Sequence, residues 1–421
     1  MMRPAAMACG ALASVVFLFA HARQADVAVL AETEADRLRP GGQYLTVDVD
    51  VDPGKTLVRE SNSRSDPQGR GLLYRDWSHN PRHQQALGPS FDAASCTGCH
   101  AELQTASRDP APDFNRWILK PIVTADRELY GDQLRTRSIG SSRPEASFKI
   151  VESIRRDHFA ATQTLTRPSP IVQVGQDTYV PSTLRVAPLL FGWGLLENID
   201  PAFIRHFHDP EDRNGDGISG RLRELDDGAI GLFGWKATQA DLQGQIVAAL
   251  INDMGIHSPG CVQPCQPELS AQELEALVDY VRRLPVPDRR SNYTQRGQDL
   301  FGLVGCSSCH VPVATTRKAS EPEFSEQLLW PYSDFMLHDM GDALADAGDG
   351  EHHREWRTAP LWGIGLLEKH APYRGFLHDG RARNLREAIL WHGGEGDASA
   401  AAFRELSAID QAQLLAYLRA L

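Results

Sequence analysis

Two segments of the chain carry apolar residues at helical spacing directly after a serine. Residues 270–284 (SAQELEALVDYVRRL) and 407–421 (SAIDQAQLLAYLRAL) repeat leucine, valine or tyrosine every three or four positions. This spacing is typical of an amphipathic helix, and a serine followed by an acid within the first turn is a helix start signal. The pattern therefore predicts a core-packed helix in each segment.

The remaining chain has few strand patterns. YLTVDVDV at 44–51 alternates apolar and polar residues as a strand does, whereas RESNSRSDPQGRG has the composition of a loop. LPVPDRRSNY at 284–293 combines two prolines with charge and has no apolar period, which indicates a linker. We therefore expect a mainly α chain with long loops.

Internal repeats divide the chain into two units. RVAPLLFGWGLLE begins at Arg185 and RTAPLWGIGLLE at Arg357, and both contain Arg-x-Ala-Pro-Leu followed by Gly-x-Gly-Leu-Leu-Glu. FHD at 207–209 then corresponds to LHD at 377–379, and a serine-led helix follows each. Because three matched blocks occur in the same order, we predict two related units in tandem.

Each unit is preceded by a Cys-x-x-Cys-His motif, CTGCH at 96–100 and CSSCH at 306–310. In this motif the two thiols add across the vinyl groups of a haem, and the histidine reaches the iron as the proximal ligand. Thioredoxin-like redox pairs and zinc sites also use Cys-x-x-Cys, but the histidine after both copies disfavours them. The motifs predict two covalently attached c-type haems, haem 1 on Cys96, Cys99 and His100, and haem 2 on Cys306, Cys309 and His310.

Haem attachment of this kind takes place outside the cytoplasm, and the first residues look like an export signal. Arg3 precedes an apolar run at 11–20, and Ala20-His21-Ala22 is a small-x-small cleavage site. No later segment has the roughly 18 apolar residues that a spanning helix needs. We expect a periplasmic protein with no transmembrane anchor after signal cleavage. The expected division is 1–22 signal peptide, 23–90 N-terminal extension, 91–290 cytochrome c-like domain 1 and 291–421 cytochrome c-like domain 2.

Charge and cysteine content add two expectations. The net charge of -12 becomes -13 when Arg3 is removed, which disfavours nucleic acid and favours a basic redox partner. Of the seven cysteines, Cys261 and Cys265 in CVQPC belong to neither the presequence nor a haem motif. In an oxidising compartment a small loop disulfide is the favoured interpretation, with a metal or redox role as the alternative.

The sequence resembles the bacterial dihaem cytochrome c peroxidase superfamily, and within it the dihaem oxidoreductase subgroup, also called thiol oxidoreductases. The similar stretches are LLENID, LFGWKA, DMGIHS, LVGCSSCHVP, YSDFMLHDMG, EWRTAPLWGIG and FLHDGRARNLREAILWHGGE. The resemblance implies that one haem is a six-coordinate electron relay and the other an open or openable site for peroxide.

The resemblance also implies a distal ligand for the relay haem. In such peroxidases this ligand is a Met fourteen residues after the His of Phe-His-Asp-Gly, and fourteen residues after His378 lies His392. Haem 2 is therefore expected to be a His310/His392 centre, with Met340 and His338 as rival ligands. Imidazole in place of thioether would lower the expected potential.

The same count in the first unit gives no ligand. Leu222 lies fourteen residues after His208, and no histidine occurs between His100 and His158. Haem 1 is thus expected to have an open sixth position for peroxide, dioxygen or another small ligand. Distant residues that folding could bring to this position are His158, His206, His257 and Met254.

One departure from the resemblance concerns the catalytic acid. The peroxidases carry a Glu in a Phe-Glu-Arg run before the second haem motif, and Val281 stands at that position here. A valine cannot move the proton that heterolytic O–O cleavage requires. Glu273 and Asp279 are alternatives on the same helix, and His338 and Asp339 are further candidate pocket groups.

Two other groups of residues have expected roles. Asp212, Asn214 and Asp216 alternate before Gly217, as oxygen ligands do in a calcium loop, although Arg223 replaces the twelfth-position Glu. Related dihaem enzymes hold calcium between their haems, so the resemblance supports one structural ion; the alternative is a plain Asp/Gly turn. Arg185 and Arg357 are expected to pair with haem propionates or to form structural salt bridges.

These observations favour a periplasmic dihaem oxidoreductase that passes electrons from haem 2 to haem 1 and reduces a small-molecule oxidant such as hydrogen peroxide. The expected partner is a periplasmic electron-donor protein. One alternative is a non-catalytic electron-transfer or redox-sensing cytochrome with both irons six-coordinate. Another is an oxidising enzyme that acts on a protein or polymer substrate.

Overall fold

The structure is a computed structural model that describes most of the chain from residue 67 onward. The described residues are 40–41, 46–47, 67–79, 88–100, 115–122, 124–156, 164–176, 178–260, 265–289, 294–346, 350–370 and 375–421. The expected signal peptide at 1–22, His158 and Cys261 lie outside them. Cys265 is disulfide-bonded, and the four motif cysteines are free thiols. Along the described part of the chain, no helix is both long and apolar enough to cross a membrane.

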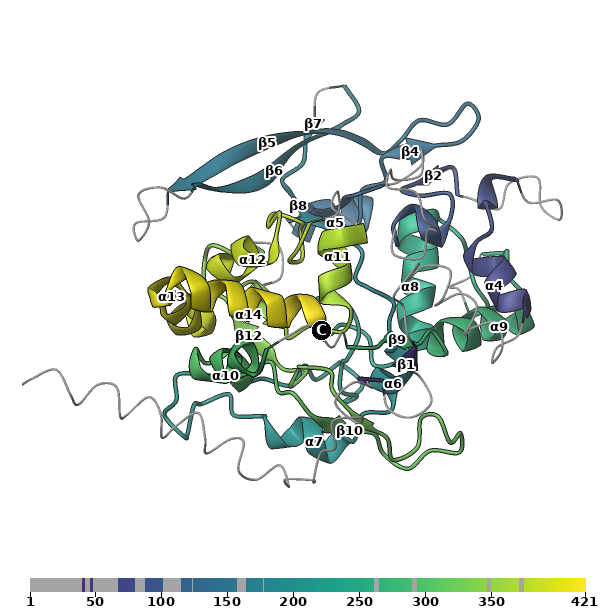
Figure 1. Ribbon diagram of the computed structural model, residues 1–421. Helices are drawn as coiled ribbons and strands as arrows, with labels where there is room; N and C mark the ends of the chain where they lie inside the picture. Colours follow the sequence, from purple (N-terminus) through teal and green to yellow (C-terminus); the bar gives the residue numbers. More distant parts are fainter. Residues whose placement is uncertain are drawn as a thin grey trace, which may run out of the picture.

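The helices form two groups, one around each motif (Figure 1). The first group consists of α4 (Pro67–Leu73), α6 (Trp193–Glu197), α7 (Pro201–His206), α8 (Leu242–Met254) and α9 (Ala271–Arg282), with the short helices η1 (Trp77–His79) and η2 (Cys96–Gly98). The second consists of α10 (Gln295–Leu303), α11 (Ile364–His370), α12 (Leu385–Trp391), α13 (Asp397–Glu405) and α14 (Ala408–Ala420), with η4 (Cys306–Ser308), η5 (Gly350–His352) and η6 (Gly394–Gly396). Helix α5 (Thr124–Tyr130) lies between strands.

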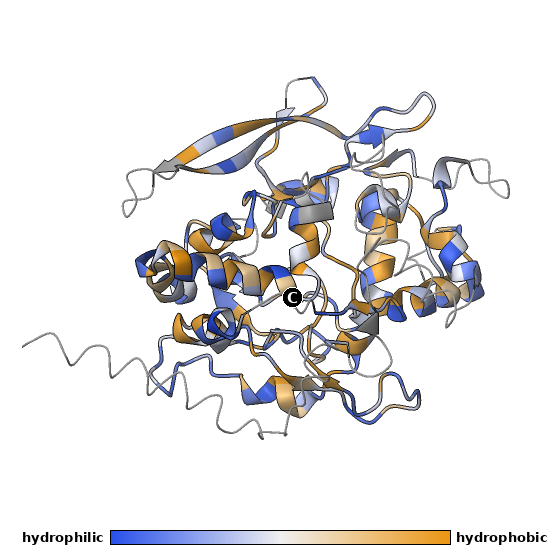
Figure 2. Ribbon diagram, in the orientation of Figure 1, coloured by the Kyte–Doolittle hydropathy of each residue, from blue (hydrophilic) through white to orange (hydrophobic). Residues whose placement is uncertain are grey.

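The two helices predicted from apolar spacing are confirmed. In α9, Ser270 accepts a hydrogen bond from the backbone N–H of Glu273, whose carboxylate accepts one from the Ser270 backbone, so the helix begins with a capping box. In α14, Ser407 accepts from the backbone N–H of Asp410. Hydrophobic and hydrophilic residues alternate along these helical ribbons (Figure 2), and the apolar faces are buried.

The expectation of a mainly α chain with two cytochrome c-like domains in tandem is wrong about the fold class, because small sheets contribute substantially. The longest strands, β5 (Ala146–Arg156) and β6 (Thr164–Val174), pair antiparallel over their whole length and continue to β7 (Thr178–Tyr179). The other pairs are β1 (Thr46–Val47) with β9 (Val286–Pro287), β2 (Ser90–Phe91) with β4 (Arg137–Ser138), β3 (Ile118–Pro121) with β8 (Ser182–Arg185), β10 (Ala314–Thr315) with β11 (Leu328–Leu329), and β12 (Leu337–Asp339) with β13 (Glu355–Arg357). The β5–β6 hairpin lies above the second helix group in Figure 1, and Leu165 of β6 belongs to the apolar cluster of that group.

Two large apolar clusters form the core. One contains residues of α4, α6, α8 and α9, and the other contains residues of α10, α12, α13 and α14. The first cluster also takes in Val311, Phe335 and Trp362, which follow the expected boundary at residue 290. The predicted domain boundaries remain predictions.

The same pair of helices packs beside each motif. Gly69 of α4 lies directly against Ala276 of α9, and Gly297 of α10 lies directly against Gln413 of α14. In both cases a Cβ atom on the glycine would overlap a backbone carbonyl oxygen, so the two backbones approach as closely as glycine permits. Helix α4, which falls within the predicted N-terminal extension, therefore takes in the first unit the place that α10 takes in the second.

A partly buried glutamate joins three helices in each unit. Glu197 accepts hydrogen bonds from the backbone N–H of Leu242 at 3.1 Å and from Nε of Arg282 at 2.8 Å. Glu368 accepts from the backbone N–H of Leu385 at 3.4 Å and from Nε of Arg419 at 2.5 Å. These contacts identify α8 as the counterpart of α12, with Leu242 and Leu385 at equivalent first positions.

Candidate functional site

The second motif lies where α10 gives way to η4. Gly305, at φ 87°, turns the chain between them, and η4 presents Cys306 and Cys309 to a cavity of about 280 Å³. The ring of His310 donates from Nδ1 to the carbonyl oxygen of Tyr332 at 2.9 Å. Burial lowers the pKa of His310 to about 4, so the imidazole is neutral. Its Nε2 is then the nitrogen available to a metal ion.

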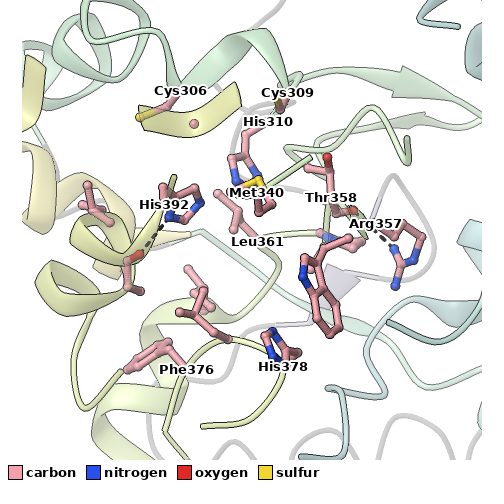
Figure 3. A pocket seen from close by; sticks show the side chains of 18 of the residues that line it. Cys306, Cys309, His310, Met340, Arg357, Thr358, Leu361, Phe376, His378 and His392 are labelled. Atoms are coloured by element: carbon pink, nitrogen blue, oxygen red, sulfur yellow. Dashed lines mark hydrogen bonds between the residues drawn. The ribbon is translucent and has the colours of Figure 1, made fainter. Parts of the chain in front are cut away.

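A second imidazole faces His310 across this cavity (Figure 3). His392, the C-cap residue of α12, donates from Nδ1 to the carbonyl oxygen of Ala388 at 2.8 Å, and burial lowers its pKa. The two ring centroids are 6.5 Å apart. Two imidazoles that share one metal ion through bonds of about 2 Å have centroids roughly 6 Å apart. The geometry is therefore that of two neutral imidazoles placed for a single iron.

The two rival ligands occupy different places. Met340 lines the same cavity, and both Met340 and His392 lie within van der Waals reach of Gly396. The His338 ring is held between two carboxylates, Asp334 at 2.9 Å and Glu395 at 2.7 Å. Both nitrogens of His338 are therefore engaged, whereas the thioether of Met340 faces the cavity beside His392.

His338 and Asp339 lie beside the second motif, away from His100. Burial favours a neutral His338 ring, but Cys309 and Asp334 outweigh this and raise its pKa well above the usual value. Its Nδ1 is 3.8 Å from the Cys309 sulfur. Asp339 accepts from the backbone N–H of Gly341 and pairs with Arg354. His338 thus belongs to a buried charged network beside Cys309, whereas the Asp339 side chain is partly exposed and pairs with Arg354.

The first motif lines a cavity of about 380 Å³. Ser95 caps η2 by accepting from the backbone N–H of Gly98, and His100 donates from Nδ1 to the carbonyl oxygen of Pro188 at 3.0 Å. Burial, reinforced by the charge of Asp253, raises the pKa of the Cys96 thiol to about 12. The donor set of two thiols and one carbonyl-bonded imidazole is the same as at the second motif.

No described histidine lies opposite His100 in this cavity. His206 and His257 are exposed on the surface, and of the rival groups among described residues only Met254 lines the cavity. Leu222, which the sequence count aligned with His392, does not line it. The long loop between α7 and α8 separates this residue from the helix that matches α12.

The matched helices α8 and α12 give the structural counterpart of His392. His392 lies seven residues after Leu385, and seven residues after Leu242 lies Ala249, which lines the first cavity. A methyl group thus stands in the first unit where an imidazole stands in the second. Methyl carbon cannot coordinate a metal ion, so this position of the fold offers no ligand in the first unit.

A pair of acids at the first cavity, buried Asp92 and partly buried Asp253, was missed by the sequence analysis. Nε2 of Gln133 donates to Asp92 and to Asp253, at 2.7 Å in each case. Burial and the charge of Asp253 raise the pKa of Asp92 to about 7, against the weaker effect of hydrogen bonds from Gln133 and Thr136, which lower it. Asp92 lies four residues before Cys96, and Asp253 lies in DMGIHS. Proximity to these motifs is a weak signal, and nothing in the sequence connects either acid to Gln133.

Aromatic and cationic side chains fill the space between the two cavities. Trp356 stacks on His378 with centroids 3.6 Å apart and 9° between the planes. Nζ of Lys236 lies 3.8 Å from the centroid of the Trp356 ring, and the Arg185 guanidinium lies 4.8 Å from it. Burial, together with nearby cations, lowers the pKa of His378 well below its usual value. Trp193 and Trp235 line both cavities, and Trp362 lines the second.

The two arginines of the repeat differ in their partners. Arg185 forms a buried ion pair with Asp346 at the first cavity. Arg357 lines the second cavity and donates to the backbone carbonyls of Gly234 and Thr358. Burial lowers its pKa to about 10, and among the described residues it forms no ion pair. A buried guanidinium of this kind is suited to an anion that enters with a cofactor.

The predicted calcium loop forms a series of tight turns. Oδ1 of Asn214 and Oδ1 of Asp216 accept from backbone N–H groups two residues ahead, and Oδ2 of Asp212 accepts from Gly217. Oδ1 of Asp212 is buried and has no hydrogen-bond partner among the described residues. The loop therefore offers one buried carboxylate oxygen without a hydrogen-bond partner among the described residues, while one oxygen each of Asp212, Asn214 and Asp216 accepts from the backbone.

Comparison with known proteins agrees with the second motif. Residues 258–421, which contain CSSCH, His378 and His392, match the family described as "Di-haem oxidoreductase, putative peroxidase". No curated protein and no solved structure matches the chain. The C-terminal part of the chain, residues 258–421, is therefore similar to the dihaem, peroxidase-like oxidoreductase family.

Proposed function

We propose that the protein is a c-type dihaem oxidoreductase that takes electrons at haem 2 and uses them at haem 1 to reduce a small oxidant, hydrogen peroxide first of all. Each cavity offers two free thiols and one imidazole whose Nδ1 is hydrogen-bonded to a backbone carbonyl. This donor set fits covalent haem attachment and a proximal ligand at both motifs.

The observation that carries the proposal is the difference between His392 and Ala249. His310 and His392 face each other at a separation suited to one iron, so haem 2 would be closed by two imidazoles. A six-coordinate iron exchanges electrons without binding substrate, which suits a relay. At the equivalent position of haem 1 the chain has only the methyl group of Ala249, which leaves room for a small ligand.

Bound haem would supply one-electron exchange at iron and, at the first site, a coordination position for the oxidant. The chain's own residues would orient both groups. Pro188 and Tyr332 fix the proximal imidazoles, and Arg357 would bind a propionate of haem 2. Arg185 would contribute positive charge at the first cavity, although Asp346 already neutralises much of it.

The alternative is an electron-transfer or redox-sensing cytochrome, and one observation favours it. Val281 is buried in the core, so no acid occupies the position of the family's Glu. Glu273 is held in the capping box of α9, and Asp279 pairs with Arg283 on the surface side of that helix. Neither alternative acid lines the first cavity.

Several finer features complete the proposal. The apolar run at 11–20 and the two haem motifs support export and a periplasmic location. The net charge of -12 supports a basic electron-donor protein as partner and disfavours nucleic acid. The unsatisfied Oδ1 of Asp212 supports one calcium ion in the loop with Asn214 and Asp216.

Low-temperature EPR of the oxidised holoprotein, before and after addition of hydrogen peroxide, tests the proposal. We expect a low-spin signal from a bis-imidazole haem beside a high-spin ferric signal, with the high-spin signal lost on addition of peroxide. Two low-spin signals that ignore peroxide, in both the fully oxidised and half-reduced protein, would support the electron-transfer alternative instead.

A further inference from the structure

Three segments bring two carboxylates to one amide group beside the first cavity. Asp92 follows β2, Gln133 precedes β4, and Asp253 lies in the last turn of α8. Besides the two bonds from Gln133, the backbone N–H of Asp92 donates to the carbonyl oxygen of Asp253 at 2.6 Å. Because both carboxylates contact the same Nε2 atom, they lie close enough for two negative charges to repel strongly.

Asp253 faces the side of the first cavity on which Ala249 lies. Asp253 lies four residues after Ala249 on α8, so both residues occupy the same face of the helix, and both line the cavity. Asp92 lies behind Asp253 and is fully buried, where Thr136 also donates to it from its backbone N–H and its hydroxyl group. The cluster therefore runs from the protein interior to the cavity, ending beside the position that matches His392.

The charges around the pair do not force it to ionise. Neither Asp92 nor Asp253 forms an ion pair with any described residue. Lys120, His100 and Arg135 act on Asp253 from a distance, and the Arg135 guanidinium is itself bound to Glu145 and to carbonyls of α8. The C-terminal end of α8 adds a negative dipole end beside Asp253.

The balance of these effects favours one proton on the pair. Burial raises the pKa of Asp253, and burial and the neighbouring charge raise the pKa of Asp92 to about 7. Two close carboxylates titrate as a unit, so the proton belongs to the pair. In the second unit Glu395, which lines the second cavity, is instead paired with His338, which lowers its pKa against the effect of burial.

We propose that Asp92 and Asp253 share one proton and deliver it from Asp253 to a ligand bound at the open position of haem 1. This inference rests on the proposed function, and it supplies the acid that Val281 cannot be. Hydrogen peroxide takes up two electrons and two protons to give two water molecules. As the O–O bond breaks, the departing oxygen forms an O–H bond with the shared proton and leaves as water. The electrons come from the donor protein through the haems, the second proton comes from solvent, and solvent reloads the pair.

Fluoride binding to the oxidised holoprotein tests the inference without turnover. A protonated pair can donate a hydrogen bond to bound fluoride, whereas an ionised pair repels it. We expect the fluoride affinity of haem 1, followed by its optical and EPR spectra, to fall about tenfold per pH unit above pH 7. Asp253→Asn and Asp92→Asn should each flatten this dependence between pH 6 and 8. Asp132→Asn, an exposed acid at the same cavity, is the matched control and should keep it.

The outcomes separate the inference from the proposed function. Failure of haem 1 to bind any external ligand would overturn the proposed function. Fluoride binding with the same pH dependence in wild type and in both Asn variants would overturn the proton-sharing pair alone. If the variants do not fold, infrared spectra of wild-type protein labelled with [4-¹³C]aspartate serve instead. An aspartic acid C=O band that titrates near neutral pH supports the pair, and the lack of any such band refutes it.

Discussion

The two haem regions are built on one helical frame but end in opposite chemistry. In both, a glycine lets two helices touch, α4 and α9 in the first unit and α10 and α14 in the second. In both, a glutamate also joins an arginine of α9 or α14 to the start of α8 or α12. His392 caps the C-terminal end of α12 opposite His310, whereas α8 presents Ala249 to the first cavity. Under the proposed function, one side chain on a shared frame would be enough to separate an electron relay from a reaction site.

The acids beside the two motifs also differ: the acid at the second motif is ion-paired, whereas the two acids at the first motif form no ion pair with any described residue. Glu395 is paired with His338 and is held ionised, while Asp92 and Asp253 have only the Gln133 amide between them. A fixed ion pair suits a site whose charge should not change. An acid pair that can hold or release a proton suits a site where protons are consumed.

The largest effect is expected from closing the open site. Ala249→His places an imidazole at the position that matches His392, so haem 1 should change from high-spin to low-spin and peroxide turnover should fall to the background rate. EPR and a peroxide-consumption assay measure the two effects. Ala249→Leu is the control, because it adds bulk without a ligating nitrogen and should leave the iron high-spin. A high-spin Ala249→His protein would break the proposed equivalence of α8 and α12.

The reverse change concerns the closed site. His392→Met replaces an imidazole ligand with a thioether, which favours the reduced iron and should raise the potential of haem 2 by on the order of 0.1 V, within the roughly 0.8 V that axial ligands span. Spectroelectrochemical titration measures the shift. Met340→Leu, at the rival position, should leave the potential nearly unchanged; a shift in Met340→Leu but none in His392→Met would identify Met340 as the ligand.

Sequence patterns point to much of this candidate site because the spacing of its motifs is local, although its residue roles remain predictions. The Cys-x-x-Cys-His motifs and the count from His378 to His392 are local, and the two serine-led helices follow from apolar spacing alone. The β5–β6 hairpin was missed because its strands, such as TLTRPSPIVQV, contain prolines and polar residues that mask alternation. A fixed count also led from His208 to Leu222, since the loop between α7 and α8 lengthens the first unit. The contact of Gln133 with Asp92 and Asp253 depends on tertiary packing, which no local pattern encodes.

The acids of the two regions should give opposite pH dependence of stability. The pKa of Asp92 is raised on folding, so its contribution to stability is lost as pH rises from about 4 to about 7, at a rate of about 1.36 kcal/mol per pH unit. The pKa of Glu395 is lowered, so its contribution is lost as pH falls below the usual glutamate range. Urea unfolding of the holoprotein at a series of pH values measures both. Asp92→Asn should remove the loss of stability with rising pH, and Glu395→Gln should remove the loss with falling pH. If both variants kept the pH dependence of the wild-type free energy of unfolding, the proposed difference between the two regions would be contradicted.

The smallest effect tests whether the α4–α9 and α10–α14 helix contacts are equally close-packed. Gly297→Ala forces a Cβ against the carbonyl oxygen of Gln413, and Gly69→Ala does the same against Ala276, so each should destabilise the protein by about 1–3 kcal/mol. Gly302 and Gly71 lie on the same helices with open space around the added Cβ. Alanine there should be neutral or stabilising by up to about 1 kcal/mol, because it reduces the conformational freedom of the unfolded chain. Denaturant midpoints of the four variants measure these differences. If Gly69→Ala behaved like Gly71→Ala while Gly297→Ala did not, the helix before the first motif would be only loosely attached, and the two regions would share less of their frame than their matched contacts indicate.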